Sequence, residues 1–268
     1  MKGLDHLVVC VNDLDAAAEK YRQLGFTVTP RARHPFGTHN CIVQLDGFFL
    51  ELLTVAEPEK ITPPQPGHFS FAAFNQHYLA KQQGCSMLVM DTDSFLGDNQ
   101  HTRQAGLDTY EPFEFSRQAI LPSKESVTVS FGLNFVSSPL MPMAAFFTCQ
   151  QFQPEYFWKD EYQQHENTAN KIIEVCLVAQ NPVEVEPFLT TFTDGEASMA
   201  RDEDIIIKTN RGRLAILTPN SFEQRYQAPA PDMSQGPQLA GFTIGIKNTT
   251  PLKPQIICGA AILFESNN

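Results

Sequence analysis

The sequence predicts an α+β protein made of repeated β-α-β-β-β units, and three observations support this. Apolar extended segments alternate with amphipathic helical segments, the same order of segments returns along the chain, and turn residues such as Gly25 and Gly47 separate the segments. The chain has 268 residues, of which 42% are hydrophobic, so it is long enough for two domains with packed cores. We expect paired modules whose sheets curve around a shared cleft.

The first module, residues 3–54, shows the pattern most clearly. The run Leu4–Val11 is typical of a buried strand, and Asn12 and Asp13 offer a helix N-cap. Gly25 predicts the end of that helix. Two further strands are expected at 40–45 and 48–54, on either side of a turn. The helix is predicted by apolar residues on one face: Leu14, Ala17, Ala18, Tyr21 and Leu24.

Three later segments repeat this order less regularly. A second module is expected over 84–152, and a third begins at 170, where Asn181 and Pro182 predict an N-cap and a first helical residue. A shortened fourth module covers 238–266. We therefore expect a first domain at 1–152, a bridge at 153–169 and a second, shorter domain at 170–268.

Composition excludes several classes of function. The formal net charge is −11 and the pI is near 5.0, so nucleic acid and anionic membranes are poor partners. The longest apolar runs are too short to cross a bilayer, and the N-terminus has no signal-peptide pattern, which predicts a cytoplasmic protein. Six scattered cysteines without CxxC spacing indicate reduced thiols. The absence of GxGxxG and GxSxG argues against dinucleotide enzymes and α/β-hydrolases.

Two stretches of sequence resemble a known family. The segment GLDHLVVCVNDLDAAAEKYRQLGF, followed by RHPFGTHN and FFLELL, resembles the first module of glyoxalase-like domains in the vicinal oxygen chelate (glyoxalase, bleomycin resistance and dioxygenase) superfamily. The segment FFTCQQFQPEYFWKDEYQQHENTA resembles the bridge between paired modules in larger proteins of that group. The resemblance implies the vicinal oxygen chelate fold, with tandem βαβββ modules paired into open, barrel-like sheets.

The resemblance also implies a divalent metal (Zn, Ni, Mn or Fe) bound by residues on the first and last strands of each module. In the first module these positions fall on His6 and Glu51, and both side chains are competent ligands. In the second module they fall near Ser86, a poor ligand, and near Thr148 or Gln150, of which only the glutamine could add a neutral oxygen. His6 could instead be a hydrogen-bonded core histidine. A carboxylate inside the apolar run around Glu51 must be paired, bound to metal or facing the cleft.

The second pair of modules carries weaker candidates. Glu174 falls at the position of His6, and Ala215 falls near that of Glu51. The fourth module puts Gly241 and Glu265 at these positions, and two carboxylates without a histidine make a weak transition-metal site. We therefore expect the second pair to be structural rather than chemical.

The loop RHPFGTHN gathers four polar side chains before a strand. Thr38 and Asn40 are candidate substrate-binding residues, while His34 or His39 could serve with Glu51 in acid–base catalysis. The alternative is an ordinary connecting turn whose polar groups satisfy the backbone.

Residues in the bridge offer further candidates for substrate contact. His165 and Asn167 could reach the first cleft, although a local capping role is the simpler interpretation. Arg31, Arg33 and Arg103 could anchor an anionic substrate, but such arginines more commonly form surface ion pairs.

With these candidate residues, the resemblance implies a metal-dependent lyase or isomerase of glyoxalase type that acts on a small molecule with vicinal oxygens, and a homodimer is the candidate assembly. A metal-free small-molecule binding or resistance protein of the same fold is the alternative. A third hypothesis is an interaction protein whose pseudo-repeats serve dimerisation.

Overall fold

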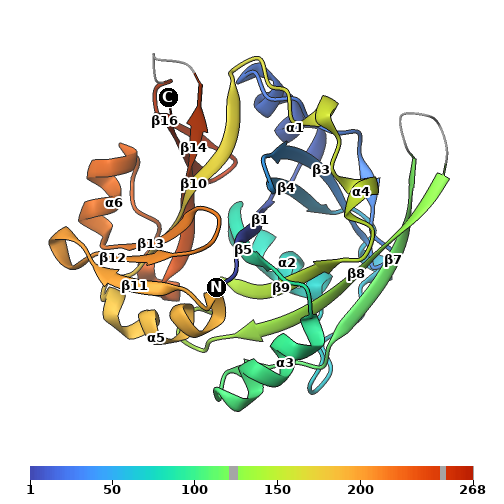
Figure 1. Ribbon diagram of the computed structural model, residues 1–268, viewed down its shortest axis with the longest axis horizontal. Coiled ribbons are helices and arrows are strands. Elements are labelled where there is room, and N and C mark those ends of the chain that lie inside the picture. The colour runs from blue at the N-terminus through green and yellow to red at the C-terminus, as the bar shows by residue number, and fades with distance from the viewer. Residues whose placement is uncertain (121–125, 248–251, 268) are drawn as a thin grey trace.

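Two mixed β-sheets form the framework of the protein, here described from a computed structural model that covers residues 1–120, 126–247 and 252–267 (Figure 1). The first sheet has nine strands, in the order β2-β3-β4-β1-β5-β9-β8-β6 with β7 paired to β8. Its strands are β1 (Leu4–Cys10), β2 (Ala32–Arg33), β3 (Thr38–Leu45), β4 (Phe48–Val55), β5 (Gly84–Asp91), β6 (Asp108–Thr109), β7 (Phe113–Ile120), β8 (Ser126–Ser137) and β9 (Ala145–Gln151).

The second sheet has seven strands in the order β11-β12-β13-β10-β14-β16-β15. Its strands are β10 (Ala169–Val178), β11 (Glu196–Met199), β12 (Ile205–Lys208), β13 (Arg213–Leu217), β14 (Gln238–Ile246), β15 (Gln255–Ile257) and β16 (Ala260–Ser266). This α+β architecture of two mixed sheets confirms the predicted fold class.

The pairing of strands shows that the two sheets share one topology. In the first sheet, β1 lies parallel to β4 and antiparallel to β5, so it joins one module to the next. In the second sheet, β10 lies parallel to β13 and antiparallel to β14 in the same way. The repeat expected from the sequence is therefore a repeat of strand order as well as of composition.

Six α-helices accompany the sheets in the described part of the chain. They are α1 (Leu14–Gln23), α2 (Phe71–Leu79), α3 (Phe95–Gln104), α4 (Pro154–Phe157), α5 (Pro182–Thr193) and α6 (Pro219–Tyr226). Asp13 caps α1 as expected, because its side chain accepts a hydrogen bond from the backbone N–H of Ala16. No helix in the described ranges is both long and apolar enough to span a bilayer.

Helices α2 and α6 were not expected from the sequence, and both matter for the clefts. Each has a local start signal, because the side chains of Ser70 and Thr218 accept hydrogen bonds from backbone N–H groups of the first turn. Both helices are short and connect the longer units. Each sheet has one face in the core shared with the other sheet. The apolar residues of α2 and α6 pack on the opposite faces.

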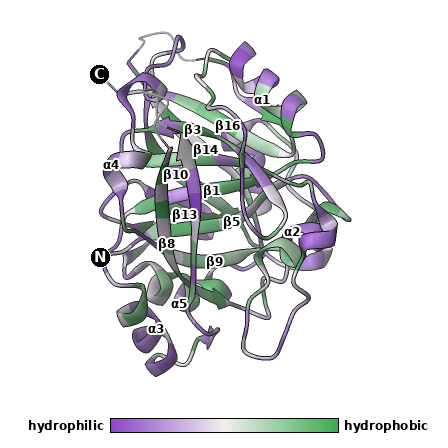
Figure 2. Ribbon diagram, turned by 90° about the vertical axis from the view of Figure 1, so that its right-hand side faces the viewer, coloured by the Kyte–Doolittle hydropathy of each residue, from purple (hydrophilic) through white to green (hydrophobic). Residues whose placement is uncertain are grey.

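Alternation along the strands divides the core into separate clusters. Leu7 and Leu50 point into a large core that also contains Leu177 of the second sheet and residues of α1 and α5. Val8, one residue along β1, points to the opposite face and joins the cluster around the first cleft. Figure 2 shows the central strands mainly in the hydrophobic colour, with hydrophilic residues on the outer helices. One face of each sheet therefore builds the shared core, and the other face is left for a cleft.

Candidate functional site

A cleft on the free face of the first sheet has about 480 Å³ of empty space, part of which is open to solvent. Five polar side chains face it from four strands and one loop: His6, His34, Asn40, Glu51 and Arg117. Aromatic side chains form most of the remaining wall: Phe36, Phe49, Phe71, Phe115, Phe131, Phe147 and Phe157. An apolar cleft with a few convergent polar groups is the usual form of a small-molecule site.

Glu51 lies at the polar end of this cleft. It is buried on β4, and strand alternation places it on the same face as Phe49. The amide Nδ2 of Asn40 donates a hydrogen bond of 2.6 Å to its Oε1. Burial raises the pKa of the Glu51 carboxyl group, while His6 and the bond from Asn40 oppose that rise. The carboxylate is therefore held in a defined orientation and has an increased affinity for a proton.

His6 is oriented by its neighbour Asp5. The Nδ1 atom of its ring lies 2.6 Å from Asp5 Oδ2, and the ring stacks on Phe49 with 4.2 Å between ring centroids. Because a carboxylate can only accept from Nδ1–H, a neutral His6 has an unprotonated Nε2. That atom lies 3.9 Å from Glu51 Oε2, inside the cleft. A histidine whose second nitrogen bonds a carboxylate is the usual arrangement of a metal ligand.

His34 faces the same carboxylate from the loop before β3. Its Nδ1 lies 2.8 Å from Thr38 Oγ1, and its Nε2 lies 3.4 Å from Asn40 Nδ2 and 3.7 Å from Glu51 Oε1. Since the amide of Asn40 donates to Nε2, the ring is neutral and carries its proton on Nδ1. Burial, assisted by the charge of Arg117, lowers the pKa of His34 to about 3.

This depressed pKa predicts that His34 makes the protein sensitive to acid. In the unfolded chain the histidine takes a proton near its ordinary value of 6.5, but in the fold it stays neutral until about pH 3. Stability is therefore present above pH 6.5 and is lost as the pH falls below it, by up to about 1.4 kcal/mol per pH unit. We expect His34→Gln to flatten the fall in unfolding free energy between pH 6.5 and 4.5, measured by urea titration.

A matched control is His77→Gln, which removes a histidine from an exposed position on α2. This variant should keep the wild-type dependence on pH. An equal slope in wild type and His34→Gln would show that the buried ring does not resist protonation in the folded protein.

Arg117 is the functional residue that the sequence analysis missed. It lies on β7 and lines the cleft, and burial lowers its pKa while Glu51 opposes that change. The arginines considered from the sequence lie elsewhere: Arg31 pairs with Asp15 at 2.8 Å, and Arg103 contacts Glu111 at 3.0 Å. The period-two pattern in β7, where Phe115 and Arg117 share a face, is the sequence signal that could have identified it.

The loop residues divide between the cleft and its surroundings. His34 and Asn40 line the cleft, whereas Thr38 reaches it only through its contact with His34. The ring of His39 lies outside, with Nε2 at 3.1 Å from Glu57 Oε2 and Nδ1 at 3.4 Å from an Arg31 nitrogen. The structure thus does not bring His39 to Glu51.

Gln150 also lies away from the His6–Glu51 pair. Its Oε1 accepts a hydrogen bond of 3.4 Å from the backbone N–H of Phe95 at the start of α3. Its neighbour Cys149 lines the cleft together with Phe147 of the same strand, because alternate side chains on a strand share a face and Gln150 points the other way. Ser86, at the matching position of β5, donates to Asn75 Oδ1 at 2.8 Å.

The two bridge residues hold the bridge to the first module. His165 accepts a hydrogen bond from the Thr27 backbone N–H at Nδ1, and its Nε2 lies 2.7 Å from the Gln44 carbonyl oxygen. Asn167 donates to the Leu24 carbonyl oxygen and accepts from the backbone N–H of Ala169. Neither residue lines the cleft.

Around Glu174, the equivalent face of the second sheet is filled by protein. Phe222 and Tyr226 of α6 pack against Cys176, Ala215 and their neighbours. Glu174, at the position matching His6, is completely buried. Its contacts are Arg213 Nε at 2.7 Å, Arg225 NH2 at 3.0 Å and the Tyr226 hydroxyl at 3.2 Å.

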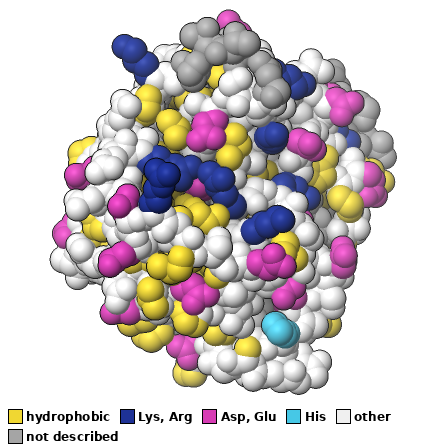
Figure 3. All heavy atoms as spheres, turned by 60° about the vertical axis from the view of Figure 1, so that its left-hand side comes forward, with side chains coloured by type: hydrophobic (Ala, Val, Ile, Leu, Met, Phe, Trp, Pro, Cys, Tyr) yellow, Lys and Arg dark blue, Asp and Glu magenta, His cyan; other side chains and the backbone are white. Residues whose placement is uncertain are grey.

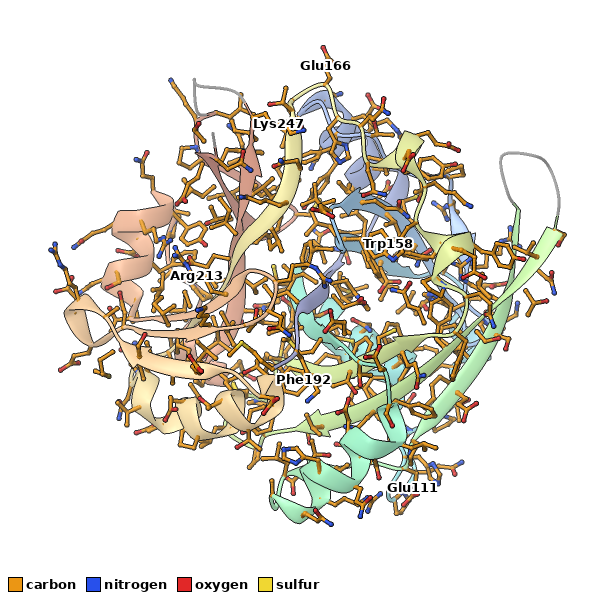
Figure 4. All side chains as sticks on the ribbon, viewed as in Figure 1. Glu111, Trp158, Glu166, Phe192, Arg213 and Lys247 are labelled. Atoms are coloured by element: carbon orange, nitrogen blue, oxygen red, sulfur yellow. The ribbon has the colours of Figure 1, made fainter. Side chains whose placement is uncertain are left out.

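This pairing leaves the arginines at the surface. Figure 3 brings that side of the molecule forward and shows Lys and Arg side chains gathered near its middle, and Figure 4 labels Arg213 beside α6. Arg213 and Arg225 keep 39% and 27% of their side chains exposed, whereas Glu174 keeps none. The Glu174 carboxylate is thus fully used by internal contacts.

The donor set of the first cleft fits a divalent metal only in part. His6 Nε2 and Glu51 Oε2 are too far apart for a direct hydrogen bond, but metal–ligand bonds of about 2.0–2.2 Å would let both reach one ion. Within residues 1–120, 126–247 and 252–267, no three His, Cys, Asp or Glu side chains form a metal-binding group. The protein supplies donors for two coordination positions, and water or substrate would have to occupy the remaining positions.

Several solved structures share the fold of this chain at low sequence identity. A hypothetical protein from Staphylococcus aureus matches with a TM-score of 0.75 and 15% identity over 99% of this chain and 100% of the other. The Mn(II)-bound glyoxalase from Novosphingobium aromaticivorans matches with 0.56 and 12% over 99% and 83%. A variant of 4-hydroxymandelate synthase from Streptomyces coelicolor gives 0.51 and 11% over 92% and 71%.

A family assignment comes from the sequence. No curated protein matches the chain at a significant level. The sequence model of the glyoxalase-like domain, however, matches residues 4–193, which is more than half of the chain and includes every side chain described in the first cleft. The chain therefore belongs to the glyoxalase-like domain family and has the vicinal oxygen chelate fold.

Proposed function

We propose that the first cleft is the active site of a glyoxalase-type lyase or isomerase. The substrate is a small, largely apolar molecule with two adjacent oxygens, and the reaction moves a proton at a carbon next to a carbonyl group. The observation that carries this proposal is Glu51, a buried carboxylate with a raised pKa that faces an open cleft instead of a counter-charge in the core. Such a group is suited to taking and returning a proton near neutral pH.

The other side chains support this role of Glu51. Asn40 donates to Oε1 and leaves Oε2 to take the proton, so in this proposal Glu51 binds the ion only while Oε2 is unprotonated. The Oδ1 atom of Asn40 is buried without a partner among the described residues, so it can accept a hydrogen bond from a bound molecule. The phenylalanine wall excludes water, which strengthens the electrostatic interactions inside.

His6 and Glu51 would hold a divalent ion in this proposal, with Asp5 fixing the His6 ring. When bound, the ion would act as a Lewis acid toward the adjacent oxygens of the substrate. His34 is a weak base because its pKa is about 3, so its neutral Nε2 is better suited to accepting a hydrogen bond than to removing a proton. The proton-transfer role therefore falls to Glu51.

Metal content tests this proposal directly. Protein purified without a chelating column should contain near-stoichiometric Zn, Ni, Mn or Fe by plasma mass spectrometry, and the double variant His6→Ala/Glu51→Ala should contain none. The variant His39→Ala/Glu57→Ala is a matched control, since it removes a histidine and a carboxylate 3.1 Å apart outside the cleft. Substrate screening with the metal-loaded protein should begin with thiol adducts of 2-oxoaldehydes.

One observation favours a metal-free binding protein as the second candidate. The cleft contains the guanidinium of Arg117, a fixed positive charge that opposes the entry of a cation. If wild-type protein takes up no divalent ion on titration but still binds small molecules in the cleft, this second function replaces the first.

A further inference from the structure

Arg117 carries a charge that the described residues do not neutralise. Within the ranges the structure describes, no carboxylate oxygen lies within 4 Å of its guanidinium and no side-chain hydrogen bond satisfies it. Glu51 acts on it at longer range, raising the pKa that burial lowers. A guanidinium has five N–H donors in a rigid fork, and that of Arg117 is half-buried beside an apolar wall. An acceptor bound in the cleft would pair with the donors that face it.

The side chains around Arg117 indicate which chemical group a bound anion would carry. Its Cζ lies 6.0 Å from the ring centroid of Phe131, which in turn stacks on Phe115 at 5.1 Å. Phe36 and His34 continue this aromatic surface, with 5.0 Å between their ring centroids. The guanidinium of Arg117, which can bind an anion, thus lies beside an aromatic surface that favours flat, apolar groups.

The number of charges in the cleft limits the anion to a single negative charge. Among the described residues that line it, Arg117 is the one arginine and there is no lysine. Glu51 at the same end would repel a second negative charge. A planar carboxylate fits a guanidinium fork in a bidentate manner, whereas phosphate groups carry more charge and are usually held by several donors.

We propose that Arg117 selects the substrate by binding the carboxylate of an aromatic monoacid whose ring lies against the phenylalanine wall. This inference rests on the proposed function only in taking the first cleft as the ligand site. It adds the substrate class, and it holds whether or not a metal is bound.

The chain provides its own reporter for ligand binding. Trp158 is the single tryptophan of the sequence. Its ring centroid lies 5.1 Å from that of Phe157 and 5.9 Å from that of Phe49, and both phenylalanines line the cleft. Figure 4 labels Trp158 beside β4, on the side of the first sheet that faces away from the second. A ligand against these rings should change the tryptophan fluorescence.

The test compares 3-phenylpropionate with 3-phenylpropionamide, which has nearly the same shape and no charge. Both are titrated into chelator-treated protein, with affinities read from Trp158 fluorescence and from isothermal titration calorimetry. We expect wild type to bind the acid at least about tenfold more tightly than the amide. Arg117→Gln should weaken binding of the acid about 10- to 100-fold and leave the amide unchanged.

Two further variants keep the test decisive. Arg117→Lys retains the charge but loses the fork, so it should still prefer the acid with intermediate affinity, and it guards against a folding defect in the glutamine variant. Arg103→Gln removes an arginine outside the cleft and should behave as wild type.

Three outcomes would overturn the proposal: no binding of the acid by wild type, no preference for it over the amide, or equal binding by Arg117→Gln. The last would mean that Arg117 only balances the charge of Glu51. Because the assay contains no metal and needs no turnover, its result is separate from the metal content that tests the proposed function.

Discussion

Replacing Glu51 with glutamine should stabilise the metal-free protein at neutral pH while removing its metal binding and its catalysis. The gain in unfolding free energy is expected to be on the order of 1 kcal/mol, or about 2–4 °C in Tm. Loss of a positioned general base should lower turnover by about 10²- to 10⁴-fold. Urea unfolding in the presence of a chelator measures the first effect, and plasma mass spectrometry measures the loss of metal.

The sign of the stability effect follows from the raised pKa of Glu51. A carboxyl group whose folded pKa lies above its unfolded value stabilises the fold while it is protonated, and this contribution is lost as the pH rises through the folded pKa. Glutamine imitates the protonated form at every pH, and its Oε1 can still accept the hydrogen bond from Asn40. The variant should therefore exceed wild type at pH 7 and approach it at pH 4.

Glu57→Gln is the matched control for Glu51→Gln. Glu57 lies outside the cleft, and hydrogen bonds from Lys60 and His39 lower its pKa, so its replacement should bring no gain at pH 7. If Glu51→Gln is less stable than wild type at pH 7 under metal-free conditions, the carboxylate is stabilised by its neighbours and the argument from burial is wrong.

The sequence predicted the modules well because each one carries its own local signals. Strands such as β1 are marked by β-branched runs, and helices such as α1 and α5 by caps or an N-terminal proline. Helices α2 and α6 were not predicted, because the repeated β-α-β-β-β unit has no helix at their positions. What decides their position is the uncovered face of each sheet, a tertiary feature that a local pattern does not show.

The candidate site was only partly predictable for a related reason. Alternation in β4 correctly put Glu51 on the same face as Phe49, because that pattern is local to one strand. Arg117 reaches the same cleft from β7, sixty-six positions further along the chain, through the long β7–β8 hairpin. His39 and Asn40 are adjacent in sequence, yet only Asn40 faces the cleft, so the composition of a loop does not decide which of its side chains take part.

Replacing Glu174 with alanine should cause the largest loss of stability, about 3–5 kcal/mol. The side chain is fully buried, accepts hydrogen bonds from Arg213 and Tyr226 and forms an ion pair with Arg225, so its removal leaves a cavity beside two guanidinium groups. Both arginines are partly exposed and can turn toward water, which places the expected loss at the lower end of this range. Urea unfolding of the full chain at pH 7 measures it.

Glu265→Ala is the control for Glu174→Ala, because Glu265 is partly exposed, lies 3.9 Å from the same Arg225 and should contribute less than about 0.5 kcal/mol. A loss below about 1 kcal/mol in Glu174→Ala would show that the buried pair is not what holds α6 against the second sheet. Affinity for 3-phenylpropionate should not change in either variant. At matching positions of one repeated topology, His6 faces an open cleft, whereas the carboxylate of Glu174 is paired with Arg213, Arg225 and Tyr226. We therefore expect ligand chemistry at the first sheet.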